Sequence, residues 1–231
     1  MPQLAYETLE RLHLRRPVER VGFIAECCRG KRVLDIGCLD ETALDKQNTD
    51  EWLHQRIGAV ATEVTGVDLS ELLPPEGLVT GPNSRIIKGD GTNPDIPSEI
   101  VDIIVAGEFI EHIENPRQFL SQIKRSYPGR EIVISTPNGV SFANALLGTI
   151  GREAQHHDHL LTSTYKTLNT LCGRAGFTAW EIIPYRFYAT EMLLQSTGFK
   201  RALVKAVEAV IRAYEHIFPL RSFGYIVRIT S

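Results

Sequence analysis

Four acidic side chains follow short apolar runs of the sequence, and carboxylates in such places can accept hydrogen bonds from a bound ligand. They are Asp35, Asp68, Asp90 and Glu108. The runs before them have the composition of β-strands, and an open parallel sheet binds ligands beyond the carboxyl ends of its strands. Acids at four successive strand ends therefore predict one polar site, although aspartate at any single position could instead start a turn or cap a helix.

The positions of these acids favour a ligand that carries adenosine. Asp68 ends the second predicted strand, where a carboxylate can accept hydrogen bonds from both hydroxyls of a ribose. Asp90 could accept a hydrogen bond from an exocyclic amine such as that of adenine, and Gly91 would let a planar ring approach the backbone. The turn after Gly37 is acidic instead of glycine-rich, and the chain has no P-loop motif. A zwitterionic amino-acid tail is therefore favoured over phosphates.

Histidines are the other side chains that could do chemistry. His112 follows the fourth strand and is the best-placed general base for an oxygen nucleophile, although it could instead bond to a neighbouring loop. A dense group, His156-His157-Asp158-His159, lies further on. Neighbours on one loop seldom converge on one ion, so we predict no metal ligands and expect this group to belong to a lid on the substrate side.

Strands and helices must alternate to position these groups. Strand-like runs are RVLDIGC, EVTGVD, SRIIKGD, VDIIVAGE and EIVISTP, and helical spacing occurs at 17–29, 50–64 and 115–127. Near-continuous apolar strands that alternate with helices are typical of a parallel sheet covered on both faces. The predicted fold class is α/β, with a doubly wound sheet.

The second half of the chain adds a helix at 163–175 that Gly176 ends, and two more strands, TAWEIIPY and FGYIVRIT, which make seven strands in all. Before the last strand, residues 191–218 carry an apolar stripe at helical spacing with basic residues around it. We expect this helix to pack over the sheet or to form a dimer contact; a basic amphipathic helix on a membrane surface is the lesser alternative.

Composition sets broad limits. The chain has 231 residues, of which 43% are hydrophobic and 23% charged, so a single domain over 1–231 with a sizeable core is expected. The formal charge of −3 offers no general attraction for a polyanion, which makes a nucleic-acid partner improbable. The sequence has no apolar run of signal-peptide or membrane-spanning length, so a cytoplasmic location is expected, with the four cysteines reduced.

The ordered segments VLDIGC, TGVDLS, IIKGDGTN, DIIVAGEFIEHIENPRQFL and EIVISTPNG resemble the motifs of class I S-adenosylmethionine-dependent methyltransferases. The resemblance spans 31–139, which would be the cofactor-binding half, and leaves 140–231 for the substrate side. It implies a Rossmann-like fold and S-adenosylmethionine as cofactor. It also implies that Asp35 and Gly37 line the methionine end, that Asp68 binds the ribose, that Asp90 meets the adenine and that Glu108 borders the cofactor opening. The candidate cofactor-binding set also includes Cys38, Leu69 and Gly91.

The turn after the first strand departs from this family. Members usually show a D-x-G-x-G-x-G turn, whereas this chain has only Gly37, followed by polar residues up to a predicted capping pair, Asn48 and Glu51, at the next helix. We expect the insert at 39–49 to form a local flap, the backbone near Cys38 and Leu39 to approach the ligand, and the Leu39 side chain to fill a pocket.

These features predict methyl transfer to a small molecule, at an oxygen atom of a sugar, quinone or natural product. One alternative is metal-assisted methylation of an RNA ribose 2′-hydroxyl. Glu108-x-x-Glu111-His112 with a later histidine resembles the metal site of small-RNA methyltransferases, but the acidic balance of the chain disfavours RNA. A second alternative is a non-catalytic binding module, which the missing glycine-rich turn would favour.

Overall fold

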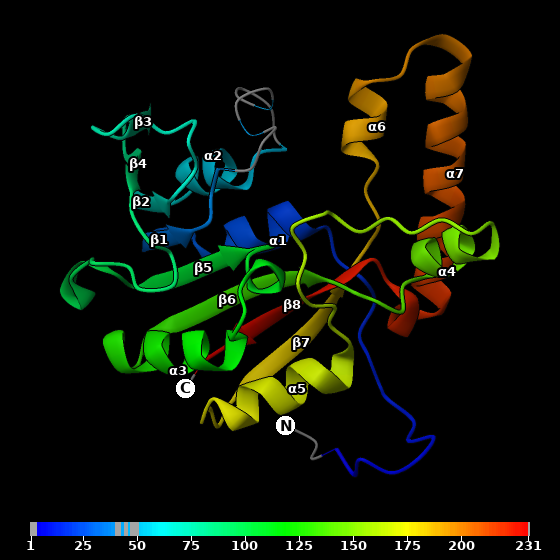
Figure 1. Ribbon diagram of the computed structural model, residues 1–231, viewed down its shortest axis with the longest axis horizontal. Helices are drawn as coiled ribbons and strands as arrows, with labels where there is room; N and C mark the ends of the chain where they lie inside the picture. Colours follow the sequence, from blue (N-terminus) through cyan, green and yellow to red (C-terminus); the bar gives the residue numbers. More distant parts are fainter. Residues whose placement is uncertain (1–3, 40–42, 44–45, 47–50, 231) are drawn as a thin grey trace.

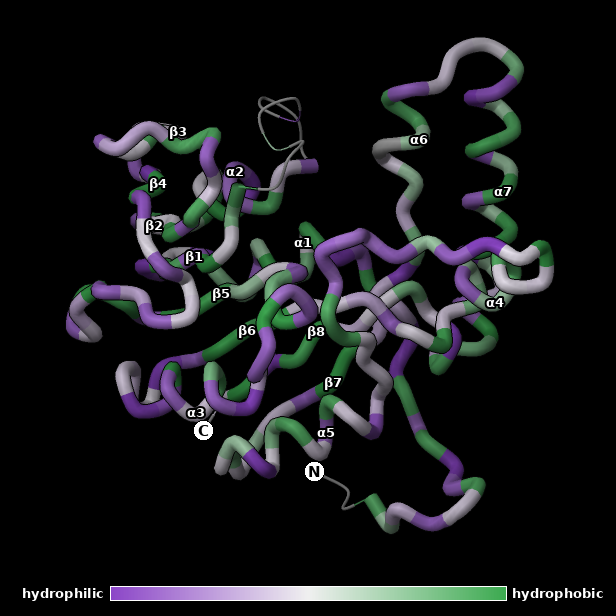
Figure 2. Tube along the Cα trace, in the orientation of Figure 1, coloured by the Kyte–Doolittle hydropathy of each residue, from purple (hydrophilic) through white to green (hydrophobic). Residues whose placement is uncertain are grey.

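A computed structural model describes residues 4–39, 43, 46 and 51–230. These residues form an eight-stranded sheet with the order β3-β4-β2-β1-β5-β6-β8-β7 (Figure 1). The strands are β1 Arg32–Ile36, β2 Glu63–Asp68, β3 Leu78–Gly81, β4 Ser84–Lys88, β5 Ile103–Gly107, β6 Glu131–Pro137, β7 Trp180–Tyr185 and β8 Gly224–Ile229. The hydropathy of the chain explains the layering, because the central strands are hydrophobic while the loops around them are largely hydrophilic (Figure 2).

Helices cover both faces of the sheet. The α-helices are α1 Arg20–Cys27, α2 Leu53–Gly58, α3 Pro116–Ser126, α4 Phe142–Thr149, α5 Tyr165–Arg174, α6 Thr190–Leu194 and α7 Gly198–Ile217. Short 3-10 turns are η1 Ser98–Ile100, η2 Ile110–His112 and η3 Pro219–Arg221. The pairs α1–α2 and α3–α5 are in contact, and they lie over opposite faces of the sheet (Figure 1). The predicted α/β, doubly wound class is therefore confirmed.

Helix α3 shows how local sequence fixes one of these elements. Asn115 caps it by accepting a hydrogen bond from the Gln118 backbone N–H at 3.0 Å, and Pro116 occupies the first turn. Its buried face, Phe119, Leu120 and Ile123, packs on the strands. Each such side chain contributes about 1.5–3 kcal/mol when fully buried. The Asn-Pro start signal predicted this helix within a residue of its observed bounds.

The strand order reverses at β1, and ligands of such sheets bind at the reversal. Strand β1 pairs in parallel with β2 on one side and with β5 on the other, and β5 pairs in parallel with β6. Their carboxyl ends therefore open at one edge, and the segments after Ile36, Asp68 and Gly107 meet there.

Three predictions about the elements differ from the structure. The sheet has eight strands instead of seven, because the short edge strand β3 pairs antiparallel with β4. The helix expected at 50–64 is only Leu53–Gly58, and it begins after Trp52 without a side-chain cap. Residues after Gly58 turn into β2, since Thr62 donates a backbone hydrogen bond to Lys31. Asn48 and most of the 39–49 insert, with its expected flap, lie outside the described residues.

The helix expected at 191–218 is also two helices. Thr197 has extended backbone angles, and Gly198 has φ +51°, a left-handed value that glycine adopts at little cost. The chain therefore turns between α6 and α7, and the hairpin stands out from one end of the molecule (Figure 1). The expectation that the apolar stripe packs over the sheet is wrong for Phe199 and Val210, which are exposed.

Buried acids on α7 hold the segment that leads into α6. Glu215 accepts a hydrogen bond from the Phe187 backbone N–H at 2.7 Å, and Glu208 accepts one from Ala189 at 3.1 Å. Arg212 donates to the Phe187 carbonyl at 2.8 Å and pairs with Glu208. These three charged side chains of α7 are thus turned toward the body of the protein, whereas Lys200 and Lys205 are exposed.

The burial of Glu215 gives stability a pH dependence. Burial raises the pKa of this carboxyl to about 7 from a usual value of 4.5. Its contribution to stability is therefore complete below about pH 4.5 and is lost as the pH rises through about 7, at about 1.4 kcal/mol per pH unit between the two values. We expect Glu215→Gln, which keeps the acceptor for Phe187, to raise the melting temperature at pH 8.5 but not at pH 4.5. Calorimetry at both pH values tests this, with the exposed Glu76→Gln as control; an equal effect at both would contradict it.

Among the described residues, no helix combines the length and apolar character needed to cross a membrane.

Candidate active site

Two glycines form a backbone cradle at the carboxyl edge of the sheet. Gly37 directly follows β1, has φ +65° and donates its N–H to the Val67 carbonyl at 3.0 Å. A Cβ built on Gly37 would lie 2.5 Å from the Phe109 ring, and one on Gly91 would lie 2.7 Å from Ile36 and 3.2 Å from Phe109. Larger residues therefore do not fit at either position. The absence of a side chain at both glycines lets the Phe109 ring pack directly against the backbone there.

Asp68 lies at the end of β2, beside this cradle. Its carboxylate accepts hydrogen bonds from the Leu39 and Ser70 backbone N–H groups, each at 2.8 Å. Burial raises the pKa of Asp68, and the two backbone donors oppose that rise. A carboxylate oxygen has more than one acceptor position, so both oxygens can still accept ligand hydroxyls. The hydrogen bond from Leu39 also places the turn after β1 against the end of β2.

Asp35 and Cys38 have structural contacts instead of an open position. Asp35 is buried, and its Oδ2 lies 2.9 Å from Nδ1 of the buried His54, whose Nε2 lies 2.9 Å from the Thr80 hydroxyl. Burial raises the pKa of the Cys38 thiol, and the Cys38 carbonyl accepts a hydrogen bond from Trp52 at 2.8 Å. The Asp35 side chain was expected at the methionine end of the ligand. In the structure it instead lies in the core, beside His54.

The remaining predicted cofactor residues lie at the rim. Asp90 is exposed and accepts hydrogen bonds from the Thr92 N–H at 2.8 Å and the Thr92 hydroxyl at 2.7 Å, so it starts a turn as well as facing outward. Leu69 is 60% exposed, beside Asp68. Leu39 is buried in a small cluster with Trp52, as a pocket filler would be.

Glu108 is held at the end of β5 by two tyrosines. It has φ +55°, a left-handed conformation that is uncommon for glutamate and that often accompanies functional sites. Tyr185 and Tyr188 each donate a hydroxyl hydrogen bond to its carboxylate, the second at 2.9 Å. The Arg20 guanidinium stacks 5.5 Å from the Tyr188 ring centroid. Next to them, burial and the charge of Glu108 raise the pKa of Glu111.

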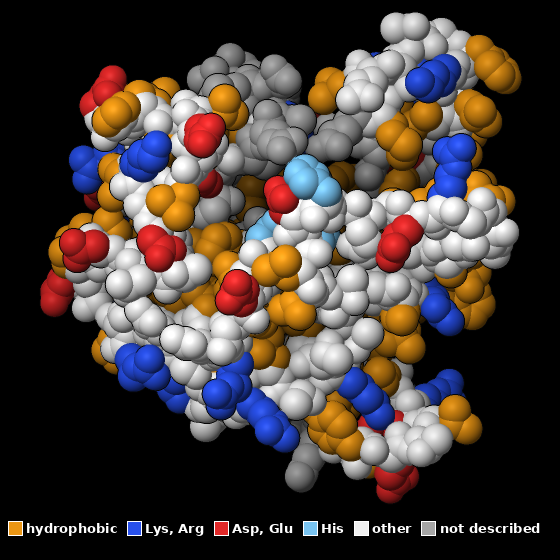
Figure 3. All heavy atoms as spheres, in the orientation of Figure 1, with side chains coloured by type: hydrophobic (Ala, Val, Ile, Leu, Met, Phe, Trp, Pro, Cys, Tyr) orange, Lys and Arg blue, Asp and Glu red, His pale blue; other side chains and the backbone are white. Residues whose placement is uncertain are grey.

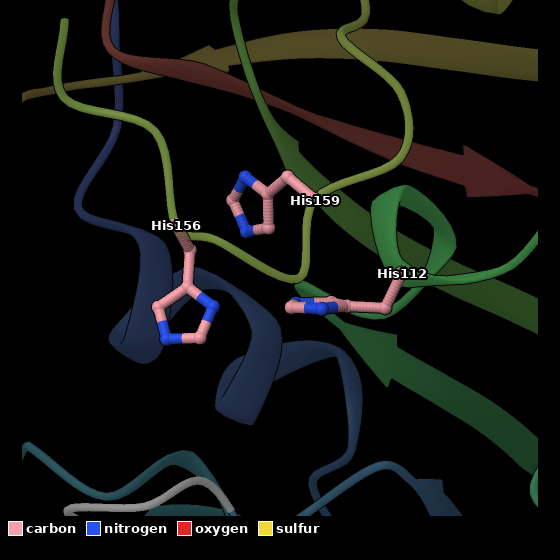
Figure 4. A group of neighbouring side chains, drawn as sticks. All are labelled: His112, His156 and His159. Carbon is pink, nitrogen blue, oxygen red and sulfur yellow. The ribbon is translucent and has the colours of Figure 1, made fainter.

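Three histidines from two segments face one another at this edge (Figure 4). One ring nitrogen from each of His112, His156 and His159 lies within 4.8 Å of the others. The pKa values of His112 and His159 are lowered, first by burial and then by the neighbouring histidines, so both rings are neutral at pH 7. The backbone N–H of Leu160 donates to the Glu111 carbonyl at 2.9 Å and holds the two segments together.

The structure brings two of the loop histidines next to His112. His156 and His159 share one cluster with His112, whereas His157 lies outside this cluster and is 74% exposed at its side chain. Histidine side chains also lie near the middle of the face shown in Figure 3. Nδ1 of His159 lies 3.0 Å from the Gln155 amide oxygen, which orients the other ring nitrogen. Neutral imidazoles in this arrangement could hold a divalent ion or accept a proton.

Sequence reasoning missed the aromatic and basic residues of the site. Phe109 lies inside a recognised motif, but the two glycines that it contacts are far from it in the chain. Tyr185 is the last residue of β7 and Tyr188 follows it, where aromatic residues in IIPYRFY were the only signal. Arg20 lies on α1, and the sequence offered no sign that it would reach the carboxyl edge.

The fold and these contacts define an α/β domain with an open polar site at the switch in strand order. A family model for a methyltransferase domain matches residues 6–182. The chain belongs to this methyltransferase family, and the resemblance to class I S-adenosylmethionine-dependent methyltransferases is confirmed.

Curated relatives are similar over part of their length. A probable S-adenosylmethionine-dependent methyltransferase of Mycolicibacterium smegmatis is 30% identical over 121 residues, which are 52% of this chain and 43% of that protein. The mitochondrial ubiquinone biosynthesis O-methyltransferase of Schizosaccharomyces pombe is 28% identical over 150 residues, 60% of this chain and 52% of that protein. The chain thus spans about half the length of these relatives.

Solved structures agree on the fold. A SAM-dependent methyltransferase of Archaeoglobus fulgidus has a TM-score of 0.52 and 20% identity, with 90% of each chain covered. A small RNA methyltransferase has a TM-score of 0.57 and 17% identity, covering 97% of this chain and 27% of that one. At these identities the likeness concerns the fold alone.

Proposed function

We propose that this protein transfers a methyl group from S-adenosylmethionine to an oxygen atom of a small molecule. The observation that carries the proposal is the arrangement at the switch point: a glycine cradle at Gly37 and Gly91, a ribose-type acid at Asp68, and a neutral histidine, His112, at the same edge. Membership of the methyltransferase family supports the reaction class, and the ubiquinone O-methyltransferase relative supports a small acceptor with a reactive hydroxyl.

The residues present fit this cofactor. Asp68 would accept hydrogen bonds from the ribose hydroxyls, and the half-buried Phe109 ring, which packs against Gly37 and Gly91, would offer an apolar surface to the adenosine. Asp90 lies at the rim, where it can meet the adenine. Glu108, held by its tyrosines, borders the methionine end and offers a carboxylate to an ammonium group.

The chain's own residues would then position and deprotonate the acceptor. Bound S-adenosylmethionine supplies a methyl group that is already activated, so the protein mainly has to align the two reactants and exclude water. His112 is neutral at pH 7 and can take the proton of an acceptor hydroxyl as the oxygen–carbon bond forms. The segment 140–231 would hold the acceptor, because it supplies His156 and His159 at the same edge.

Calorimetric titration with S-adenosylmethionine tests the first step. We expect saturable binding well below millimolar ligand, and competition by S-adenosylhomocysteine. Binding would then be followed by incubation of a panel of phenols, quinols and sugars with a labelled methyl donor. Absence of binding at millimolar ligand would overturn the proposal. Binding without transfer to any panel member or to small RNA would instead favour a non-catalytic module.

A second candidate reaction uses a divalent metal ion at the three histidines. The observation that favours it is the convergence of His112, His156 and His159, which would offer three imidazole nitrogen ligands of the kind that zinc prefers. The ion would lower the pKa of an acceptor hydroxyl, so His112 would act as a ligand instead of a base. The net charge of −3 continues to favour a small acceptor over RNA in either reaction.

A further inference from the structure

Helix α7 carries an uncovered apolar seam along its whole length. The seam consists of Phe199, Leu203, Ala206, Val210, Ala213 and Ile217, all of them exposed. Phe199 is 84% exposed, Val210 66% and Ile217 69%. Hydrophobic side chains lie along the outer edge of the α6–α7 hairpin (Figure 3). Large apolar side chains in a continuous exposed row mark an interaction surface.

The spacing of the seam is that of a helix that packs against another helix. Successive members are separated alternately by four and three residues. This spacing keeps the apolar side chains on the side of the helix that faces a partner helix. Five of the six flanking positions are Ala202, Val207, Ala209, Tyr214 and His216, and the sixth, Lys200, is the one flanking lysine or arginine. A seam with so little charge on its flanks is suited to close helix–helix contact.

We propose that this seam pairs with the same seam of a second copy, with the two α7 helices antiparallel. Around a two-fold axis near residue 208, Leu203 would face Ala213 of the other copy, and Ala206 would face Val210. In these two pairs a larger side chain meets an alanine, as interdigitating helices require. Phe199 and Ile217 would close the two ends of the seam.

The charges of α7 favour a second copy over a membrane surface. A helix that lies in a membrane interface carries cations along the border of its apolar face. Here Arg201 donates to the Leu193 carbonyl at 2.8 Å and Arg212 to the Phe187 carbonyl at 2.8 Å, so both point toward the protein. In α7, which the structure describes in full, the acids Glu208 and Glu215 are also buried. Lys200 and Lys205 are exposed, one on each side of the seam, so the helix offers only two lysines to lipid headgroups.

The available area suits a dimer of moderate affinity. A helix of 20 residues is about 30 Å long. The six seam residues and Val207 from each copy would bury about 1,000 Å² in total, near the lower limit of specific interfaces. We expect association in the micromolar range, and the pairing does not depend on the proposed function.

Sedimentation velocity over about 1–100 µM protein tests the pairing. We expect a shift from 25.9 kDa to twice that mass. Leu203→Glu and Ala213→Lys should each remain monomeric, whereas their mixture should dimerise, because residue 203 faces residue 213 only in the antiparallel arrangement. Val79→Lys, at another exposed apolar position, is the control and should dimerise like the wild type.

Several outcomes would overturn the proposal. They are a wild type that stays monomeric throughout, a Leu203→Glu variant that still dimerises, and a mixture that stays monomeric. Co-sedimentation of the monomer with phosphatidylglycerol vesicles, lost in Leu203→Glu, would assign the seam to a membrane instead. Circular dichroism of each variant confirms that the fold is kept, which the exposure of residue 203 leads us to expect.

Discussion

Asp68→Ala will lower the affinity for S-adenosylmethionine by about 100-fold, because a hydrogen bond to a charged group contributes about 1.5–3 kcal/mol and the ribose offers two hydroxyls. Alanine also removes the acceptor for the Leu39 backbone N–H. Asp68→Asn separates the two effects, since its amide oxygen can keep the bond to Leu39 while the charge is lost. We expect Asp68→Asn to weaken binding by about tenfold.

Asp102→Asn is a matched control for this prediction. Asp102 is also a carboxylate in hydrogen bonds, but it pairs with Arg32 at the amino ends of the strands, where that guanidinium lowers its pKa to about 2. Its replacement should reduce stability and leave the affinity for S-adenosylmethionine unchanged. Titration calorimetry measures all three variants. Full affinity in Asp68→Ala would refute the ribose assignment, while a wild type that fails to bind would refute the proposed function itself.

His112→Ala will lower kcat by about 10²–10⁴-fold, the usual contribution of a general base, with little change in the affinity for S-adenosylmethionine. Burial lowers the pKa of His112 below 6.5, so the wild-type rate should rise with pH through that lowered value as the ring loses its proton, and then level off. The variant should lose this rise. His157→Ala, in the neighbouring loop but outside the cluster, should behave like the wild type.

Comparison of His112→Ala with the metal-depleted wild type distinguishes a general base from a metal ligand at His112. If the three histidines hold an ion, dialysis of the wild type against a chelator should cause the loss seen in His112→Ala, and added Zn²⁺ or Co²⁺ should restore the rate. Bound Co²⁺ would also give visible absorption bands that His159→Ala abolishes and His157→Ala keeps. Activity that survives the chelator leaves His112 as the base. A His112→Ala rate equal to that of the wild type would exclude both roles.

The strands could be predicted from the sequence because their apolar runs are buried on both faces. Strand β3 was missed since it is an edge strand of four residues, of which only Leu78 and Val79 are apolar. The split between α6 and α7 was missed because the stripe continues on both sides of the break at Gly198, where only the backbone angle shows the turn. The helical periodicity of the sequence thus identified these residues as helical. It did not show where the helix is interrupted, because the interruption depends on the local backbone geometry.

The sequence predicted those residues of the candidate site that lie at the end of a strand. Asp68 and Glu108 lie at the expected edge because the register of a parallel sheet puts them there. Asp35 could not be placed in the same way: its partner His54 lies on α2, and nothing in the sequence links the two residues. The histidine cluster likewise depends on a backbone hydrogen bond between Leu160 and Glu111 that no spacing rule contains.

The place of β8 in the sheet has a consequence for the order in which the chain can fold. Strand β8 lies between β6 and β7 and pairs with both, although it follows them in the sequence. During synthesis, β7 therefore has no neighbouring strand of the sheet until residues 224–229 have left the ribosome, whereas β1 to β6 can already pair. We expect the half with Asp68 to form early, and the tyrosines that hold Glu108 to dock late, in a step slowed by its long-range contacts.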